Sequence, residues 1–270
     1  MSTDTRFLPR PEGRIAYDVT GDGPLVVLVP GMGDLRSTYR FLAPALAAAG
    51  HRVVTTDLRG HGDSDATFTS YGDVETAGDL VALLDELGGP AVVVGNSMGA
   101  GAGVIAAADR PDLVSGLVLV GPFVRDGAIN GVMKLVFRIA TLTPFAAMTW
   151  KSYAPRLYAG AKPADLDAYL AEVIASIRRP GYAKAFSLTT RLTHAPAEAR
   201  IADVTAPVLV VMGELDPDFP DPRAEADWIA TTLHAEVVMV PESGHYPQSQ
   251  RPEIVADAVL GFLTRVAHRA

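Results

Sequence analysis

The sequence predicts an α/β fold built on a mostly parallel, doubly wound β-sheet. Six short runs of β-branched and aliphatic residues are almost entirely apolar, which is typical of parallel strands buried on both faces. Amphipathic stretches of helical length lie between most of these runs, so strands and helices alternate along the chain. One long stretch, 123–202, breaks this alternation and contains only helix-like segments.

The first strand-like segment differs from the six apolar runs. Residues 14–19, Arg-Ile-Ala-Tyr-Asp-Val, alternate between polar and apolar and precede a Gly-Asp-Gly turn at 21–23. This pattern predicts an antiparallel hairpin strand at the edge of the sheet. The six apolar runs are expected as strands at 25–29, 53–56, 91–94, 117–120, 208–212 and 237–240.

Helices are expected both in the α/β core and in the stretch without strands. Those of the core are predicted at about 37–49, 73–87, 98–109, 223–233 and 252–268. Four more, punctuated by prolines, are predicted at about 128–142, 145–159, 164–178 and 182–193. We therefore expect a core formed by 1–122 and 203–270, with a helical cap at 123–202 inserted between its strands.

The cap and the core differ in net charge. From 123 to 200 there are eleven Lys and Arg against five Asp and Glu, a net charge of +6. The rest of the chain holds twelve against twenty-six, a net charge of −14, which accounts for the overall −8. A net negative charge argues against a nucleic-acid partner, because phosphate contacts need surplus Lys and Arg.

The 270 residues include no cysteine, which excludes a disulfide framework, a thiolate zinc site and a cysteine nucleophile. Residues 90–108 carry no charge and have the length of a membrane span, but glycines interrupt them, so a buried strand turning into a helix is predicted instead. The N-terminus lacks the basic start and apolar core of a secretory signal peptide, so we expect none. We expect a cytoplasmic protein with a small-molecule substrate, no membrane span, no metal and no cofactor, and we leave a homodimer open.

Residues 95–99 read Gly-Asn-Ser-Met-Gly and fit the pattern Gly-x-Ser-x-Gly, directly after a predicted strand and before a predicted helix. In this context Ser97 lies on a strained turn that pushes its hydroxyl out of the sheet. Gly95 and Gly99 leave room for the turn, where a Cβ would clash with backbone. The sequence therefore predicts Ser97 as a nucleophile, with a glycine-rich turn and a bystander serine as the alternative.

A serine hydroxyl needs a base and an acid that orients the base. His245 follows the last strand-like run and Asp216 follows the run before it, so both are expected at the carboxyl edge of the sheet, where Ser97 also lies. We predict His245 as the base and Asp216 as the orienting acid. Three other acids remain alternatives: Asp126, Asp218 and Asp221.

An oxyanion hole would complete this set of residues. One donor is expected to be the backbone N–H of Met98, immediately after the nucleophile. The second is expected from the Pro-Gly-Met-Gly loop at 30–33, and we predict the N–H of Met32. Each such donor lowers a reaction barrier by about 3 kcal/mol. The alternative is that 30–33 is a simple turn.

Taken together, these pieces resemble the α/β-hydrolase superfamily, in its cap-bearing branch of esterases, lactonases and C–C hydrolases. The resemblance rests on 30–33, on Asp-Leu-Arg-Gly-His-Gly-Asp-Ser at 57–64, on the Ser97 turn, and on the positions of Asp216 and His245 in the family's chain order. Many relatives carry histidine where Pro30 stands, but backbone donation does not need that side chain. The loop 57–64 is mostly structural in the family, so we assign no chemistry to His61.

The resemblance implies hydrolysis of a carboxylic ester or lactone through an acyl-enzyme on Ser97. A dehalogenase or an epoxide hydrolase of this fold would carry aspartate at that position. The Gly-Asn-Ser-Met-Gly sequence is also similar to hydrolases that cleave C–C bonds in diketones, although those usually have Trp after the histidine, where Tyr246 stands here. A ligand-binding or signalling protein that keeps the triad is a further alternative.

Apolar and aromatic side chains of the cap are expected to roof the cavity above Ser97, because the insertion emerges at that edge of the sheet. We predict that Phe137 and Trp150, with Tyr246, line the substrate pocket. Ligand pockets are largely apolar with a few polar groups that fix orientation. The sequence therefore predicts a small, largely apolar substrate.

Overall fold

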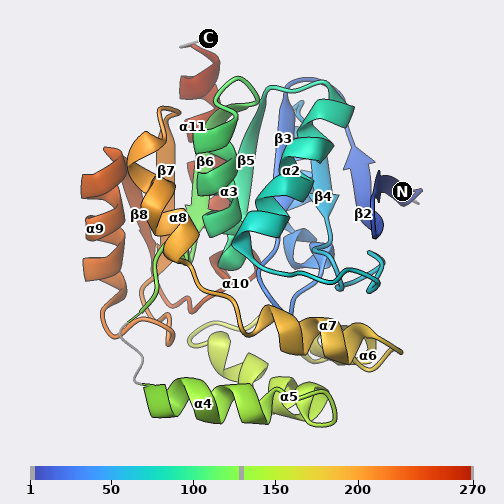
Figure 1. Cartoon of the computed structure of the whole chain (residues 1–270). Coiled ribbons are helices and arrows are strands. Elements are labelled where there is room, and N and C mark those ends of the chain that lie inside the picture. The colour runs from blue at the N-terminus through green and yellow to red at the C-terminus, as the bar shows by residue number, and fades with distance from the viewer. Residues whose placement is uncertain (1–3, 128–130, 269–270) are drawn as a thin grey trace.

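The structure is a computed structural model that describes residues 4–127 and 131–268, with helices on both sides of a central sheet (Figure 1). These residues form eight strands in the order β1-β2-β4-β3-β5-β6-β7-β8. The six strands from β4 to β8 in this order run parallel, so the predicted mostly parallel, doubly wound sheet is confirmed. The strands are β1 (Arg6–Arg10), β2 (Gly13–Thr20), β3 (Leu25–Val29), β4 (Arg52–Thr56), β5 (Ala91–Asn96), β6 (Val114–Val120), β7 (Val208–Gly213) and β8 (Glu236–Val240).

The N-terminal hairpin corrects one prediction. The strand expected at 14–19 is present as β2, but it lies between β1 and β4 and pairs antiparallel with both, so it is not the edge strand. The edge strand is β1, which the sequence pattern missed because it has arginine at both ends and Pro9 inside. Proline lacks a backbone N–H and is therefore tolerated at a sheet edge, where one side of the strand has no partner.

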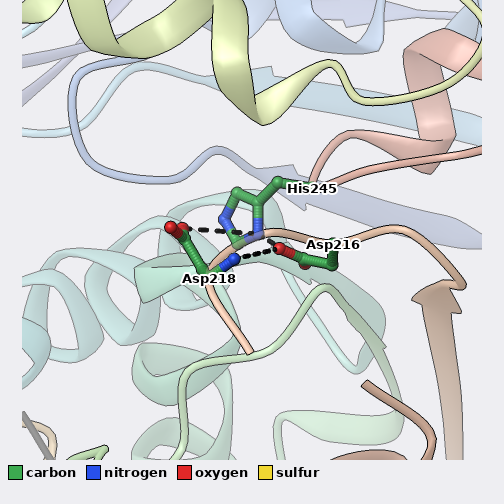
Figure 2. A group of neighbouring side chains, drawn as sticks. All are labelled: Asp216, Asp218 and His245. Atoms are coloured by element: carbon green, nitrogen blue, oxygen red, sulfur yellow. Dashed lines mark hydrogen bonds and ion pairs between the residues drawn. The ribbon is translucent and has the colours of Figure 1, made fainter. Parts of the chain in front are cut away.

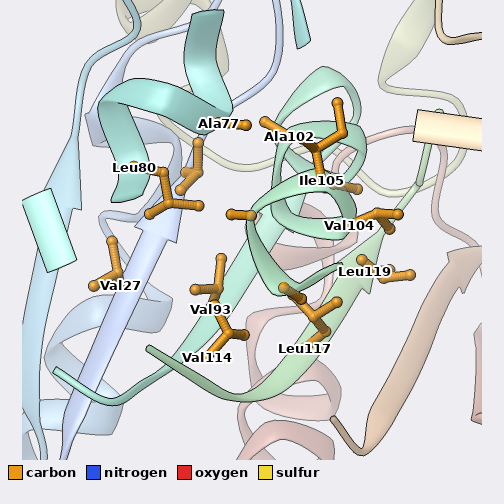
Figure 3. Packing of buried hydrophobic residues seen from close by; sticks show 14 of the residues in the cluster. Val27, Ala77, Leu80, Val93, Ala102, Val104, Ile105, Val114, Leu117 and Leu119 are labelled. Atoms are coloured by element: carbon orange, nitrogen blue, oxygen red, sulfur yellow. The ribbon is translucent and has the colours of Figure 1, made fainter. Parts of the chain in front are cut away.

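Alternate side chains of the parallel strands pack in two separate hydrophobic cores, one on each face of the sheet. Val93 of β5 and Leu117 of β6 belong to the cluster under α2 (Asp73–Leu87) and α3 (Met98–Asp109), as Figure 3 shows. Val92 and Val94 belong to the cluster on the opposite face. Because both faces are covered, these strands are apolar at every position, and each fully buried valine contributes about 1.5–3 kcal/mol.

The helices of the core lie close to their predicted places. Both α2 and α3 have the predicted bounds, whereas the segment predicted at 37–49 is divided into two. The helices on the α2 side include α8 and α9, and those on the opposite face include α1 and α11. Their bounds are η1 (Arg36–Tyr39), α1 (Leu42–Ala48), α8 (Ala195–Arg200), η2 (Ile201–Asp203), α9 (Pro222–Leu233), α10 (Pro247–Gln250) and α11 (Pro252–Ala267).

The chain leaves the sheet after β6 and forms a helical layer beyond the carboxyl ends of the parallel strands (Figure 1). Its helices are α4 (Gly131–Ala140), α5 (Ala146–Leu157), α6 (Leu166–Ile177) and α7 (Tyr182–Thr189). Residues 128–130, with which the first of these was predicted to begin, lie outside the described residues. Helices α5 to α7 share a third hydrophobic cluster with Tyr246, whereas Ala197 and Ile201 already pack in the main core.

The uncharged stretch 90–108 forms β5 and α3 rather than one long helix. Within the described ranges, no helix combines the length and the apolar composition that crossing a bilayer requires.

Candidate active site

Ser97 occupies a tight turn between β5 and α3. Its backbone has φ 56° and ψ −121°, in a region that non-glycine residues rarely adopt, at a cost of about 1–3 kcal/mol. A Cβ on Gly95 would lie 2.3 Å from the Gly99 carbonyl oxygen, and one on Gly99 would lie 2.5 Å from the Val29 carbonyl oxygen. Both glycines are therefore required by the close approach of β3, β5 and α3, as the sequence predicted. The Ser97 side chain remains half-buried.

His245 and Asp216 form a buried hydrogen-bonded pair at the same edge of the sheet. His245 Nδ1 lies 2.7 Å from Asp216 Oδ2, and both residues are 2% exposed. The two loops cross closely, because a Cβ on Gly213 would lie 2.0 Å from the Gly244 carbonyl oxygen. A carboxylate on Nδ1 fixes a proton there, so in the neutral ring Nε2 is the atom that accepts one.

Two neighbouring carboxylates control the charge of the imidazole. Burial lowers the pKa of His245, but the charges of Asp216 and Asp218 and the hydrogen bond to Asp216 raise it to about 9. Asp218 Oδ2 lies 3.8 Å from His245 Nδ1, and the Asp218 N–H donates to Asp216 Oδ1 at 3.0 Å (Figure 2). The hydroxyl of Tyr153, on α5, donates to Asp218 Oδ1 and so links the helical layer to this acidic group.

Asn96, the last residue of β5, connects the Ser97 turn to the His245 loop by a hydrogen bond. Its Nδ2 donates to the His245 carbonyl oxygen at 3.2 Å and to the Val120 carbonyl oxygen at 3.0 Å. Among the described residues, the Ser97 hydroxyl makes no hydrogen bond with the imidazole. Catalytic hydrogen bonds are often long without substrate and tighten when it binds.

The other predicted acids have different surroundings. Asp221 caps α9 by accepting from the Ala224 N–H at 3.0 Å. Asp126 accepts from the Thr193 hydroxyl and the His194 N–H, across the two ends of the helical layer. Of the four acids considered, Asp216 is the one hydrogen-bonded to His245, with Asp218 beside it.

Asp216, Asp218 and His245 also form a group whose ligand atoms lie within 4.8 Å of one another, close enough to hold a metal ion. The Nδ1 atom that would bind such an ion is the one engaged with Asp216. Metal binding would require the neutral imidazole to present a lone pair at that atom. The geometry therefore fits an acid–histidine pair better than a metal site.

The loop 30–33 lies directly against the serine. A Cβ on Gly31 would lie 2.7 Å from Ser97 Cβ and 3.3 Å from its hydroxyl oxygen, so Gly31, the residue before Met32, packs against the serine. Met98 is the first residue of α3, and an N–H in the first turn of a helix has no acceptor within that helix. Of the two predicted oxyanion donors, Met98 directly follows Ser97, and Met32 directly follows Gly31, which packs against Ser97.

His61 holds this loop in place, a role that the sequence did not reveal. The Gly33 N–H donates to His61 Nε2 at 3.0 Å, and His61 Nδ1 lies 3.0 Å from the Arg59 carbonyl oxygen. An acceptor Nε2 and a donor Nδ1 define the neutral tautomer. Burial lowers the pKa of His61 to about 4, which keeps that tautomer at neutral pH.

Asp34, immediately after this loop, was also missed. It is buried, and the Tyr169 hydroxyl and the Leu35 N–H donate to its Oδ1. Burial raises the pKa of Asp34 to about 6, although these hydrogen bonds oppose the change. Tyr169 lies on α6, 135 residues away in sequence, so no local pattern could have found the pair.

The three residues predicted to line the substrate pocket lie in different surroundings. Trp150 is buried, its Nε1–H donates to the Gly33 carbonyl oxygen at 2.7 Å, and its ring lies 5.2 Å from Phe186. Tyr246 is buried beside the histidine, with ring centroids 5.2 Å apart. Phe137 is half-buried, 6.3 Å from the ring of Tyr153.

A separate hollow of about 900 Å³ lies between η1, β4 and α6. Arginines line it, but Arg36 is paired with Asp57, and Arg40 makes two hydrogen bonds of 2.7 Å to Asp165. The third arginine of the lining, Arg179, donates to the Gly62 carbonyl oxygen and lies 3.9 Å from Asp63. Each of the three cations already has partners, so the hollow does not resemble an anion site. The arrangement that can perform chemistry is the group around Ser97 and His245.

Comparison with known proteins agrees with this fold. The model of the alpha/beta hydrolase family matches residues 26–258. The chain is 30% identical to the putative carbamate hydrolase RutD of Variovorax paradoxus over 93% of this chain and 96% of that protein. It is 29% identical to the 2-(acetamidomethylene)succinate hydrolase of Mesorhizobium japonicum over 93% and 92%. A crystal structure of an alpha/beta hydrolase fold protein from Burkholderia ambifaria, 26% identical, superposes with a TM-score of 0.82 over 96% of this chain and all of that one. The chain belongs to the alpha/beta hydrolase family.

Proposed function

We propose that the protein is a serine hydrolase that cleaves the carboxylic ester or lactone bond of a small, largely apolar substrate through an acyl-enzyme on Ser97. The observation that carries the proposal is the buried His245–Asp216 hydrogen bond of 2.7 Å at the sheet edge where the strained Ser97 turn ends β5. Membership of a hydrolase family supports it.

In the proposed mechanism Asp216 holds a proton on Nδ1 of His245, and Nε2 takes the proton of the Ser97 hydroxyl as Oγ attacks the carbonyl carbon. The imidazolium that forms is stabilised by the same two carboxylates that raise its pKa to about 9. The N–H groups of Met32 and Met98 would hold the oxyanion. The imidazolium then gives its proton to the departing alkoxide, and water releases the acid by the same route.

We further propose that 123–202 acts as a cap that selects substrates. Three aromatic side chains of this stretch lie in contact or near contact with catalytic loops: Trp150 donates to Gly33, Tyr153 donates to Asp218, and Phe186 lies 6.5 Å from the ring of His61. Such contacts place apolar surface of the insertion near the reacting groups. The absence of cysteine supports a cytoplasmic location.

The proposal is tested by turnover of p-nitrophenyl butyrate. Ser97→Ala should reduce kcat by about 10⁶ if the three residues act as a unit. Ser176→Ala, at another half-buried serine in α6, is the matched control and should leave kcat within about twofold of the wild type, as expected for a serine outside the machinery. Equal activity in both variants would refute a serine mechanism at position 97.

A C–C hydrolase of a diketone is the second candidate, favoured by the Gly-Asn-Ser-Met-Gly sequence at 95–99. Both candidates need Ser97 and His245, so the substrate separates them. An ester hydrolase should turn over p-nitrophenyl butyrate and leave a vinylogous diketone unchanged, and a C–C hydrolase should show the reverse preference in kcat/KM.

A further inference from the structure

The outer part of the helical layer carries a cluster of exposed apolar side chains. Ten large apolar residues are exposed among the described residues, and six of them fall within 14 residues of sequence, between 39% and 64% exposed. Isolated exposed apolar residues are ordinary on protein surfaces, whereas a contiguous group marks an interaction site. We call this group the α4–α5 patch: Leu135, Val136, Ile139, Leu142, Phe145 and Met148.

Helical spacing places the α4 part of the patch on one face. Leu135, Ile139 and Leu142 are four and three residues apart, so they form a single stripe along α4 and its C-terminal end. The Phe145 N–H donates to the Leu142 carbonyl oxygen at 2.8 Å, which closes the turn and carries the patch onto α5. In Figure 1, α4 and α5 are the helices farthest from the sheet.

The other face of α5 is already occupied. Trp150, Ala154 and Leu157 of that helix are buried in the cluster shared with α6 and α7. The patch therefore is not the packing face of the insertion but a second apolar face that the described residues leave uncovered.

Basic residues lie between and beside the patch residues along the chain. Residues 127–164 contain five Lys and Arg and no Asp or Glu, in a chain whose net charge is −8. Four of these cations are exposed in the structure: Arg138, Lys151, Arg156 and Lys162. An apolar face with a cationic border is complementary to a surface that is apolar inside and negatively charged outside.

We propose that the α4–α5 patch docks the protein on the surface of an anionic lipid bilayer, with the two helices lying in the interface and not crossing it. Helices that bind in this way combine an apolar face with Lys and Arg at its border, and each such cation adds attraction to anionic headgroups. A second copy of the chain fits less well, because a two-fold contact would bring the same basic side chains together without an acid between them. The proposal does not depend on the chemistry assigned to Ser97.

The test is co-sedimentation of the full-length protein with vesicles of phosphatidylcholine alone and of phosphatidylcholine with 30% phosphatidylglycerol. The wild type should bind the anionic vesicles more tightly, and binding should weaken as salt is raised, because salt screens surface charge. Val136→Asp should weaken binding at least tenfold. Val74→Asp is the matched control, since Val74 on α2 is 53% exposed and Val136 is 52% exposed, and it should bind as the wild type does.

A second pair of variants isolates the charge. Arg138→Gln should weaken binding to anionic vesicles about fivefold, the equivalent of the ~1 kcal/mol that one cation contributes near such a surface. Arg178→Gln, which removes an exposed cation directly after α6 and outside the patch, should have no effect. All four substituted residues are exposed, so each variant should give the circular dichroism spectrum of the wild type. An unchanged spectrum would show that the variant is folded.

Three results would overturn the proposal. The wild type could remain in the supernatant with anionic vesicles. Val136→Asp and Val74→Asp could bind equally. Sedimentation velocity could reveal a dimer that Val136→Asp alone dissociates, which would assign the patch to a second copy of the chain instead of lipid.

Discussion

Two loops at the carboxyl edge of the sheet each bury a histidine, and their neighbours give the two rings opposite properties. His245, after β8, is 2% exposed, and His61, after β4, is 4% exposed. Burial lowers the pKa of both rings, but carboxylates raise that of His245 to about 9, whereas His61 has backbone partners and a pKa of about 4. One ring is built to accept and hold a proton, and the other to remain a neutral hydrogen-bond acceptor.

Burial alone does not assign a catalytic role to a histidine. Asp216 and Asp218 are close enough to stabilise an imidazolium, which a general base becomes during the reaction. Around His61 the partners are the Gly33 N–H and the Arg59 carbonyl oxygen, which fix a tautomer without favouring charge. We therefore propose proton transfer as the role of His245 and positioning of the loop 30–33 as the role of His61.

The largest loss of kcat should come from removing the acid that is hydrogen-bonded to His245. Asp216→Asn should lower kcat by about 10⁴, because an amide at this place favours the wrong tautomer of the ring. Asp218→Asn should cost much less, since Asp218 lies 3.8 Å from the same nitrogen and is not hydrogen-bonded to it. Steady-state kinetics on p-nitrophenyl butyrate measures both, and the reverse ranking would transfer the orienting role to Asp218.

A smaller effect is expected at the other histidine. His61→Ala removes the acceptor of the Gly33 N–H and should lower kcat by about 10²–10³, the cost of a misplaced oxyanion donor. His61→Gln, which offers an acceptor oxygen, should recover part of that loss. The half-buried His51, before β4, provides the control, and an equal loss in His51→Ala would show that the effect is not specific to the loop 30–33.

The cap residues should affect substrate choice more than chemistry. Trp150→Ala and Phe137→Ala should change the ranking of esters of increasing acyl length by about 10-fold or more, since one methylene of fit is worth 1–3 kcal/mol. Met148→Ala, at a residue 64% exposed, is the control and should leave the ranking unchanged. If both cap variants slowed every ester by the same factor, the insertion would be a structural lid without a role in selection.

The smallest expected effects are on the pH dependence of folding stability. They should have opposite signs for the two histidines. A pKa of His245 raised to about 9 stabilises the folded state fully below pH 6.5, and this stabilisation is lost as pH rises toward 9. A pKa of His61 lowered to about 4 has the opposite consequence, because stability is present above pH 6.5 and is lost as pH falls toward 4. Each group changes the unfolding free energy by at most about 1.4 kcal/mol per pH unit.

Urea titrations across pH 4 to 9 would measure these slopes. Asp218→Asn should flatten the alkaline part, and the rise of kcat/KM with pH should move to lower pH, because one anion that favours the imidazolium is gone. His61→Gln should flatten the acidic part alone. A variant that changed both parts equally would contradict the assignment of separate charge states to the two rings.

The sequence predicted most of the sheet because local patterns determine it. Strand β3 and helices α2 and α3 have their predicted bounds, since apolar runs end at glycine or proline and amphipathic segments begin and end sharply. The same logic placed Asp216 and His245 after neighbouring strands, and the structure brings these two together. The roles assigned to Ser97, Asp216 and His245 remain predictions for the experiments above.

Contacts between distant segments were beyond the reach of local patterns. Tyr153 and Asp218 are 65 residues apart, and Gly33 and His61 are 28 apart, so neither hydrogen bond leaves a signal in spacing or composition. Strand β1 was missed for a different reason, because an edge strand can contain Pro9 and charged residues that a buried strand excludes.

Covalent trapping of the nucleophile shows directly whether Ser97 reacts together with His245. A fluorophosphonate probe should add one phosphonyl group to the wild type, and peptide mass spectrometry should locate it on Ser97. Ser97→Ala should remain unlabelled, while His61→Gln, which keeps the serine and its base, should still be labelled. A phosphonyl group on any other residue, or unchanged labelling of Ser97→Ala, would contradict the account.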